Sequence, residues 1–265
     1  MVSIHGRHNI LNEGQVLQQR QLLIAGDSHV KAFGIPLKSA DGSVELVRVN
    51  ETVCGVASAW PRDFNEYWDA VATFAQDRCV AVSWGGNRHL AHYLFAPSPL
   101  FDFLIAEQPD LPLDESALIV PEEAIRAFIV SPIRNMERRV ASLRNVAAQV
   151  LVPGTPPPKD DDAFIRNRFS KEPHFVRMAE NLGVSLDEVP FSPALLRLKM
   201  WIVMQSLLRE MAERTGSIFI PVPSPALTEK GFLHPDCYAD DVTHANENFG
   251  KIMLKELLAT CEWSN

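Results

Sequence analysis

The chain has 265 residues, of which 46% are hydrophobic and 22% are charged. This length is enough for one large domain with a substantial core, and we expect a single domain over residues 1–265. The 25 Lys and Arg residues against 33 Asp and Glu residues give a formal net charge of −8, and no basic cluster interrupts this acidity. That balance argues against a nucleic-acid partner.

The start of the chain and its cysteines predict a reducing compartment. Residues 1–20 lack the cationic start and apolar segment of a signal peptide, and no apolar run approaches membrane-spanning length. The scattered cysteines contain no CxxC pair, which is typical of reduced thiols rather than a disulfide framework or a zinc site. They are Cys54, Cys79, Cys237 and Cys261. We therefore expect a cytoplasmic protein with no membrane partner, whose oligomeric state the sequence leaves open.

Short apolar runs alternate with helical patterns along the chain. The runs that predict strands are Gln21–Ala25, Ser43–Asn50, Cys79–Ser83, Val150–Val152 and Ser217–Pro221. Strands that alternate with helices favour a mainly parallel sheet covered on both faces. Five strands fit a flavodoxin-like, doubly wound α/β sheet better than an eight-stranded barrel.

Three longer stretches predict the main helices. The first runs from about Pro121 to Ala148, and we expect the Ser131-Pro132 pair to break it into two pieces. The second runs from about Pro193 to Arg214, with Gly216 just past its end, as helix termini prefer. The last runs from about Asn246 to Thr260 and closes the predicted fold.

Two connections are longer than simple crossovers need. Residues 92–118 are rich in Pro, Phe and Leu, and residues 156–193 carry the acidic patch Asp160–Asp162, followed by basic residues and Phe. Loops this long are generally functional or mobile. We expect these two insertions to form a lid or a substrate wall. The alternative is that they are ordinary surface loops.

The first predicted strand ends in Gly26-Asp27-Ser28-His29. This position places a hydroxyl at the carboxyl edge of the sheet, where open α/β folds bind their ligands. A serine nucleophile needs a base within reach and a group that orients this base. A serine that follows a glycine is also common in plain turns, so the tripeptide alone does not decide between the two.

Asp241 and His244 provide a base and an orienting acid, three residues apart on a short loop before the last helix. In such an arrangement the carboxylate holds the imidazole tautomer while the other ring nitrogen points outward. The alternative is that Asp241 or Thr243 only caps the last helix and that His244 is a surface residue.

Donors for an oxyanion follow the second and third predicted strands. The third strand runs into Trp84-Gly85-Gly86-Asn87, and the Asn87 amide can donate a hydrogen bond into a site there. Gly55, after the second strand, can present its backbone N–H, although a plain turn also explains this glycine.

In their order along the chain, these blocks resemble the SGNH (GDSL-type) hydrolase family, over about residues 21–260. The resemblance implies a five-stranded parallel sheet and hydrolysis of a carboxylic ester, with a small O-acyl group such as acetyl on a small molecule or carbohydrate. It implies Ser28 as nucleophile, His244 as general base and Asp241 as its partner. The implied oxyanion donors are Ser28, Gly55 and Asn87. No metal or organic cofactor is implied.

The chain departs from the family pattern at two positions. His29 follows the serine where the family usually has Leu, and Arg88 follows Asn87 where the family usually has an acidic residue. Arg88 can place a cation near the mouth of the site and favour a negatively charged substrate, or it can pair with a local carboxylate.

Other functions use some of the same residues. Asp27 and His29, with Asn87 and His89, partly match the ligand blocks of metallophosphoesterases, but the further Gly-Asp-x-x-Asp and Gly-His-x-His blocks are absent. An acyltransferase with the same triad and a non-catalytic binding relative are further alternatives.

Two residue groups have a second interpretation. A mononuclear metal site is conceivable from the cluster His234, Asp236, Asp241 and His244. The aromatic residues of the first insertion can shape a substrate pocket or pack in the core. These are Tyr93, Phe95, Phe101 and Phe103.

Overall fold

The computed structural model describes residues 22–34, 44–48, 52–53, 56–57, 64–83 and 94–261. Its centre is a five-stranded sheet in the order β2-β1-β5-β8-β9, and every neighbouring pair is parallel. The strands are β1 (Leu22–Gly26), β2 (Val44–Arg48), β5 (Cys79–Ser83), β8 (Gln149–Pro153) and β9 (Ile218–Ile220). This is the flavodoxin-like order, so the predicted α/β fold class is confirmed.

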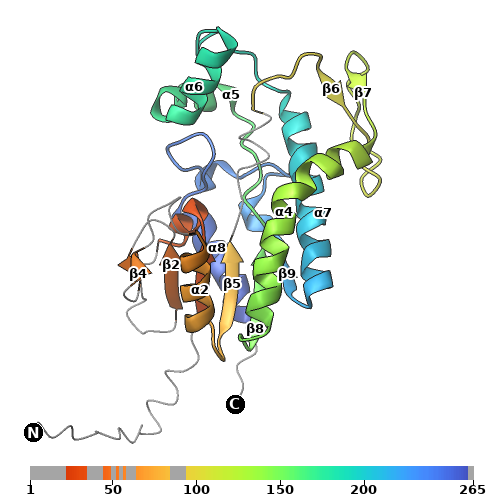
Figure 1. Ribbon diagram of the computed structural model, residues 1–265. Coiled ribbons are helices and arrows are strands. Elements are labelled where there is room, and N and C mark those ends of the chain that lie inside the picture. Colours follow the sequence, from red (N-terminus) through yellow and green to blue (C-terminus); the bar gives the residue numbers. More distant parts are fainter. Residues whose placement is uncertain are drawn as a thin grey trace, which may run out of the picture.

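Helices cover both faces of the sheet, and the alternation within β1 shows why. Leu23 and Ala25 pack with α2, α4 and α7, whereas Leu22 and Ile24 pack with η2 and α8 on the other face. Figure 1 shows α2 and α4 in front of the sheet and α8 behind it. The bounds are η2 (Ser28–Phe33), α2 (Phe64–Phe74), α4 (Glu122–Arg144), α7 (Ala194–Thr215) and α8 (Glu247–Thr260). Among the described helices, none is long and apolar enough to cross a membrane.

The prediction that Pro132 breaks the first long helix is wrong. The helix α4 runs without interruption from Glu122 to Arg144, and Figure 1 shows that it bends along its length. A proline inside a helix removes one hydrogen bond and crowds the preceding turn, which bends the helix when both halves are held. Here Ile129 before the proline and Ile133 after it are buried in the same core, so packing holds both halves. The predicted ends of α7 are confirmed, with Pro193 before it and Gly216 after it at φ 66°.

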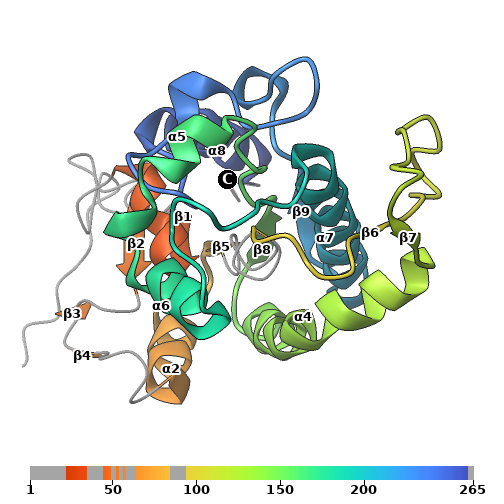
Figure 2. The same cartoon turned by 90° about the horizontal axis from the view of Figure 1, so that it is seen from above.

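The two long connections form separate segments. The β6–β7 segment, residues 100–120, contains β6 (Phe101–Asp102) and β7 (Leu118–Ile119). The α5–α6 segment, residues 156–193, contains α5 (Asp162–Arg166), η3 (Phe169–Lys171) and α6 (Pro173–Leu182). Figure 2 shows β6 and β7 on the side of α7, while α5 and α6 lie towards β1 and β2. The remaining short elements are β3 (Thr52–Val53), β4 (Val56–Ala57), η4 (Ser224–Ala226) and η5 (Pro235–Cys237).

Two cysteines that are far apart in the sequence meet at the amino edge of the sheet. Cys79, at the start of β5, is a buried thiol whose sulfur lies 2.6 Å from that of Cys261, just after α8. The sequence did not predict this contact. It joins the ends of two elements at the sheet edge opposite to Ser28, so these thiols lie away from the site described next.

Candidate active site

Ser28 lies at the carboxyl end of β1, where the backbone is tightly fixed. A Cβ atom on Gly26 would lie 1.7 Å from the carbonyl oxygen of Ser83, so only glycine allows β1 to approach β5 there. The buried Tyr67 hydroxyl accepts from the Gly26 N–H at 2.9 Å and donates to the Gly26 carbonyl at 3.1 Å. Ser28 follows as the first residue of η2, and its side chain is exposed.

The neighbours of Ser28 have structural contacts of their own. Asp27 caps η2, since its Oδ1 accepts from the His29 N–H at 3.1 Å. The His29 ring is buried and lies with its centroid 4.8 Å from that of His244, tilted by 38°. His29 therefore packs against the other imidazole, and His244 is the ring that faces Ser28.

The structure brings Ser28, His244 and Asp241 together in one hydrogen-bonded chain. Ser28 Oγ lies 2.8 Å from His244 Nε2, and His244 Nδ1 lies 2.9 Å from Asp241 Oδ2. An ionised carboxylate only accepts hydrogen bonds, so we assign the ring proton to Nδ1. The Nε2 lone pair then accepts from the Ser28 hydroxyl, which is the arrangement needed to remove its proton.

The turn before α8 orients both Asp241 and His244. Asp241 Oδ1 accepts from the backbone N–H groups of Thr243 and His244, at 3.0 and 2.7 Å. The helix cap is Asn246, whose Oδ1 accepts from Asn248 N at 2.8 Å. The alternative in which Asp241 or Thr243 caps the last helix is therefore wrong.

Close packing of α8 on η2 sets the distance between base and serine. A Cβ atom on Gly250 would lie 1.8 Å from the carbonyl oxygen of Ala32, so the two backbones are in direct contact. His244 lies just before α8 and Ser28 begins η2, so this contact holds the two partners of the Ser28–His244 hydrogen bond close together. Gly250 was not predicted as part of the site, although a single glycine inside a helical pattern is a signal of close packing.

A buried cation lies against the turn that carries Asp241. Lys159 is 1% exposed, and its Nζ donates to the carbonyl oxygens of Asp241 at 2.5 Å and Ala239 at 3.0 Å. Burial lowers the pKa of Lys159 to about 8, partly offset by nearby carboxylates. Burial alone would raise the pKa of Asp241, but the hydrogen bonds and charge of His244, together with Lys159, lower that pKa well below its usual range. The acidic patch that follows Lys159 stands out in the sequence, whereas the lysine itself was not predicted to lie near the site.

Other residues named from the sequence fall in parts of the chain that the structure does not describe. Gly55, Asn87, Arg88, His89 and Tyr93 lie outside the described residues.

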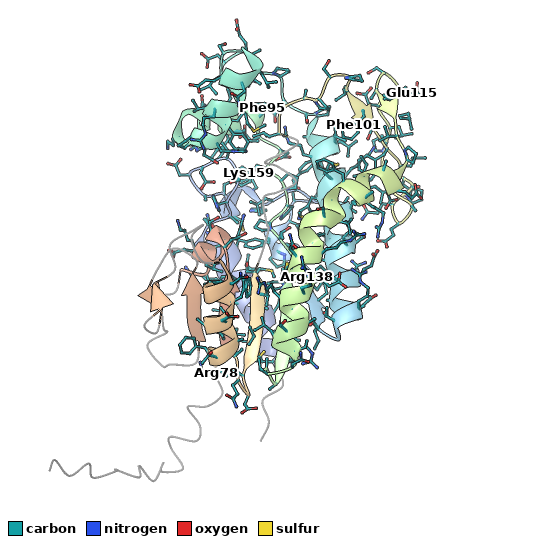
Figure 3. The ribbon with its side chains drawn as sticks, in the orientation of Figure 1. Arg78, Phe95, Phe101, Glu115, Arg138 and Lys159 are labelled. Atoms are coloured by element: carbon teal, nitrogen blue, oxygen red, sulfur yellow. The ribbon has the colours of Figure 1, made fainter. Side chains whose placement is uncertain are left out.

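The described aromatic residues of the first insertion have packing roles. Phe103 is buried in the main core, and Phe101 packs against that core from the β6–β7 segment. Phe95 is buried in a separate cluster with the α5–α6 segment. Figure 3 shows Phe101 on the β6–β7 side of the molecule, apart from Lys159. Of the two predicted roles for these residues, core packing therefore holds for Phe95 and Phe103.

The alternative interpretation of His234, Asp236, Asp241 and His244 as a mononuclear metal site has no support in the structure. Within the ranges that the structure describes, no group of three or more His, Cys, Asp or Glu side chains is placed to hold a metal ion. His234 instead accepts locally from the Asp236 N–H at 3.3 Å.

Comparison with known proteins finds likeness in structure only. No protein-family model matches the chain, and no curated protein matches it. A catalytic mutant of an acetylxylan esterase from Geobacillus stearothermophilus is 15% identical with a TM-score of 0.46, over 93% of this chain and 96% of that chain. An extracellular lipase from Streptomyces rimosus is 12% identical with a TM-score of 0.48, over 92% and 100%. A protein from Slackia heliotrinireducens, provisionally assigned to the SGNH hydrolases, is 16% identical with a TM-score of 0.43, over 91% and 98%. These TM-scores are low, so the fold class rests on the strand order.

Proposed function

We propose that this protein is a serine hydrolase that cleaves a carboxylic ester through an acyl-enzyme on Ser28. The observation that carries the proposal is the continuous hydrogen-bonded chain from Ser28 through His244 to Asp241, with contacts of 2.8 and 2.9 Å. It stands at the carboxyl edge of a parallel sheet, where this architecture binds its ligands. A nucleophile, a base and an orienting acid are thus in the order that acyl transfer requires.

The proposed reaction has two halves. In the first, His244 Nε2 takes the Ser28 proton while Oγ attacks the ester carbonyl, and the resulting imidazolium is stabilised by Asp241. The tetrahedral intermediate then expels the alcohol, which receives that proton from His244. In the second half, His244 takes a proton from water, the hydroxide attacks the acyl-enzyme, and the proton returns to Ser28 as the acid leaves.

The proposed oxyanion hole uses the backbone N–H of Ser28, the backbone N–H of Gly55 and the side-chain amide of Asn87. Ser28 is the first residue of η2, and the first N–H groups of a helix have no acceptor within that helix. Gly55 and Asn87 are assigned from their positions after strands of the sheet and from the family resemblance of the motifs.

Exposure of the site favours hydrolysis over transfer to another alcohol. Ser28 is exposed and the His244 side chain keeps 27% of its surface accessible, so water can reach the acyl-enzyme. An acyltransferase must exclude water at this stage. The proposed substrate carries a small acyl group such as acetyl on a small molecule or a carbohydrate, and the mechanism uses no metal or organic cofactor.

Labelling with a fluorophosphonate probe tests the nucleophile. The wild-type protein should be labelled and should hydrolyse p-nitrophenyl acetate, and Ser28→Ala should lose both properties. Ser224→Ala, at an exposed serine of η4, is the matched control and should keep both. Labelling that persists in Ser28→Ala would refute the assignment, and a series of p-nitrophenyl esters of increasing acyl length tests the small-acyl preference.

A further inference from the structure

The turn that carries Asp241 and His244 is contacted from outside the sheet by the α5–α6 segment. Lys159, near the start of that segment, donates to two carbonyl oxygens of this turn, those of Ala239 and Asp241. Its ammonium group also lies 4.0 Å from the Asp241 carboxylate. Figure 3 shows Lys159 between helix α6 and the upper end of the sheet. A side chain that is 1% exposed has little room to move, so these contacts restrict the turn.

A second contact from the same segment reaches a backbone N–H group of this turn. Glu172 Oε1 accepts from the Val242 N–H at 2.6 Å. The Val242 side chain is buried in the core of the α5–α6 segment, with Phe169 and Phe175. The turn therefore has its carbonyl groups bound by a cation and an N–H group bound by a carboxylate, and both partners come from one segment.

The segment itself is anchored to the main fold at Lys159. Arg197 on α7 is fully buried and donates to the Lys159 carbonyl oxygen at 3.3 Å. The same guanidinium binds the Ser192 carbonyl oxygen at 2.8 Å and the Asp162 carboxylate at 2.6 Å. These bonds connect both ends of the α5–α6 segment to α7, so the position of Lys159 is set by the scaffold.

On the basis of the proposed function, we propose that Lys159 and Glu172 are positioning residues of the esterase site. They hold residues 239–244 so that Asp241 meets His244 Nδ1, and His244 in turn meets Ser28. The charge of Lys159 adds to this geometry, because a cation beside Asp241 favours the ionised carboxylate that stabilises the imidazolium. The insertion that the sequence predicts as a lid or a substrate wall thus serves as a clamp on residues 239–244, the turn that carries Asp241 and His244.

Because the proposed clamp includes the charge of Lys159, it implies that kcat depends on pH. The charged groups that face Lys159 are Asp240 and Asp241 from the turn and Arg168 and Glu172 from its own segment, and the titratable ring of Tyr238 lies 5.2 Å from its Nζ. Because burial lowers the pKa of Lys159 to about 8, the ammonium group loses its proton in mildly alkaline solution. We expect kcat to fall as pH rises through this range.

Lys159→Met tests the clamp, with Lys171→Met as the matched control. Lys171 lies in the same segment and also binds the turn, through the Asp240 carboxylate, but both side chains of that ion pair are exposed (53% and 70%), so it should contribute little to holding the turn. For Lys159→Met we expect kcat on p-nitrophenyl acetate to fall roughly 10- to 100-fold, because the base His244 is misplaced. KM should change little. The acid limb of its pH–rate profile should move to higher pH, and the alkaline limb near pH 8 should disappear. Lys171→Met should stay within about twofold of wild type.

A second pair of variants keeps the test decisive if Lys159→Met does not fold. Glu172→Ala removes the acceptor of the Val242 N–H, whereas Glu172→Gln keeps an oxygen at that place. We expect the alanine variant to lose kcat by about tenfold. The glutamine variant should keep most of the wild-type kcat.

The outcomes separate the two proposals. A wild-type protein that is neither labelled by the fluorophosphonate nor active on esters overturns the proposed function, and the clamp with it. An active wild type whose Lys159→Met and Glu172→Ala variants retain both kcat and the pH–rate profile overturns the clamp alone. Loss of kcat in these variants, with rescue by Glu172→Gln, supports it.

Discussion

The α5–α6 and β6–β7 segments are anchored by the same device but support different parts of the molecule. Each is bound by a fully buried cation of α7, and the two cations are only two residues apart. Arg197 binds the α5–α6 segment through Asp162 and two carbonyl groups. Lys199 binds the β6–β7 segment through Asp102, at 2.8 and 2.9 Å, and the Pro112 carbonyl.

The difference between the segments lies in what they contact beyond α7. The α5–α6 segment reaches the acid–base turn through Lys159 and Glu172. The β6–β7 segment packs against the main core, where Phe103 is buried. Similar anchoring therefore does not imply a similar role, and changes in the two segments should separate catalytic activity from folding stability.

The largest expected effect lies in the turn that the α5–α6 segment holds. Asp241→Asn keeps the size of the side chain but cannot hold the Nδ1–H tautomer of His244 in the same way. We expect turnover to fall by roughly 10³- to 10⁴-fold, as when the acid of such a triad becomes an amide. Steady-state hydrolysis of p-nitrophenyl acetate measures this loss, and thermal melting should show that the protein remains folded. A loss of less than tenfold would remove Asp241 from the triad.

Breaking the anchor of the β6–β7 segment should lower the stability of the protein but leave kcat unchanged, which is the reverse of the effect expected for Asp241→Asn. Lys199→Met leaves the Asp102 carboxylate buried without its ion-pair partner, although that carboxylate still accepts from Phe103 N and Asp114 N. Loss of one partner from a buried pair costs about 3–5 kcal/mol in the free energy of unfolding. Urea denaturation measures this change, while kcat below the unfolding transition should stay near that of wild type. A large loss of kcat in the folded variant would show that the β6–β7 segment also supports the site.

A change at the α8–η2 contact should lower both the stability of the protein and kcat. Gly250→Ala places a methyl group against the Ala32 carbonyl, so α8 must move away from η2. Overpacking of this kind costs about 1–3 kcal/mol of stability. Because His244 moves with α8, we also expect roughly a tenfold loss in kcat. Unchanged kcat in a destabilised variant would mean that the turn holds His244 independently of the helix.

The strands and the three residues that meet in the chain of hydrogen bonds could be predicted from sequence because each leaves a local pattern. The apolar run of β1 ends in Gly26-Asp27-Ser28, and Asp241 and His244 lie three residues apart. Short local motifs were therefore enough to predict this part of the site. The helix α4 shows the limit of such patterns. Pro132 favours a break locally, yet burial of the flanking isoleucines keeps one helix, and this burial depends on residues far away in the chain.

The supporting residues could not be predicted for a related reason. Lys159 resembles a surface lysine beside an acidic patch, and only the fold buries it against the turn around Asp241. Tyr67 likewise sits in an ordinary amphipathic helix, and its bond to Gly26 spans 41 residues. Contacts made by a single polar atom across such distances have no periodicity or spacing that a sequence reveals.

The smallest expected effect concerns how stability depends on pH, and it again distinguishes the α5–α6 segment. The pKa of Lys159 is about 8 in the folded protein and 10.5 as an ordinary value, so between these pH values the unfolded chain binds more protons than the folded one. The contribution of Lys159 to the free energy of unfolding should therefore rise with pH across this window, by at most about 1.4 kcal/mol per pH unit.

Urea denaturation between pH 8 and 10 checks this effect by comparing wild type with Lys159→Met. The difference in unfolding free energy between the two should shift in favour of wild type as pH rises, because the methionine variant lacks this group. Lys171→Met should follow the wild-type curve, since its ion pair is exposed. Parallel curves for wild type and Lys159→Met would mean that Lys159 keeps an ordinary pKa in the folded protein. Any alkaline loss of activity would then have to arise from a group other than the clamp.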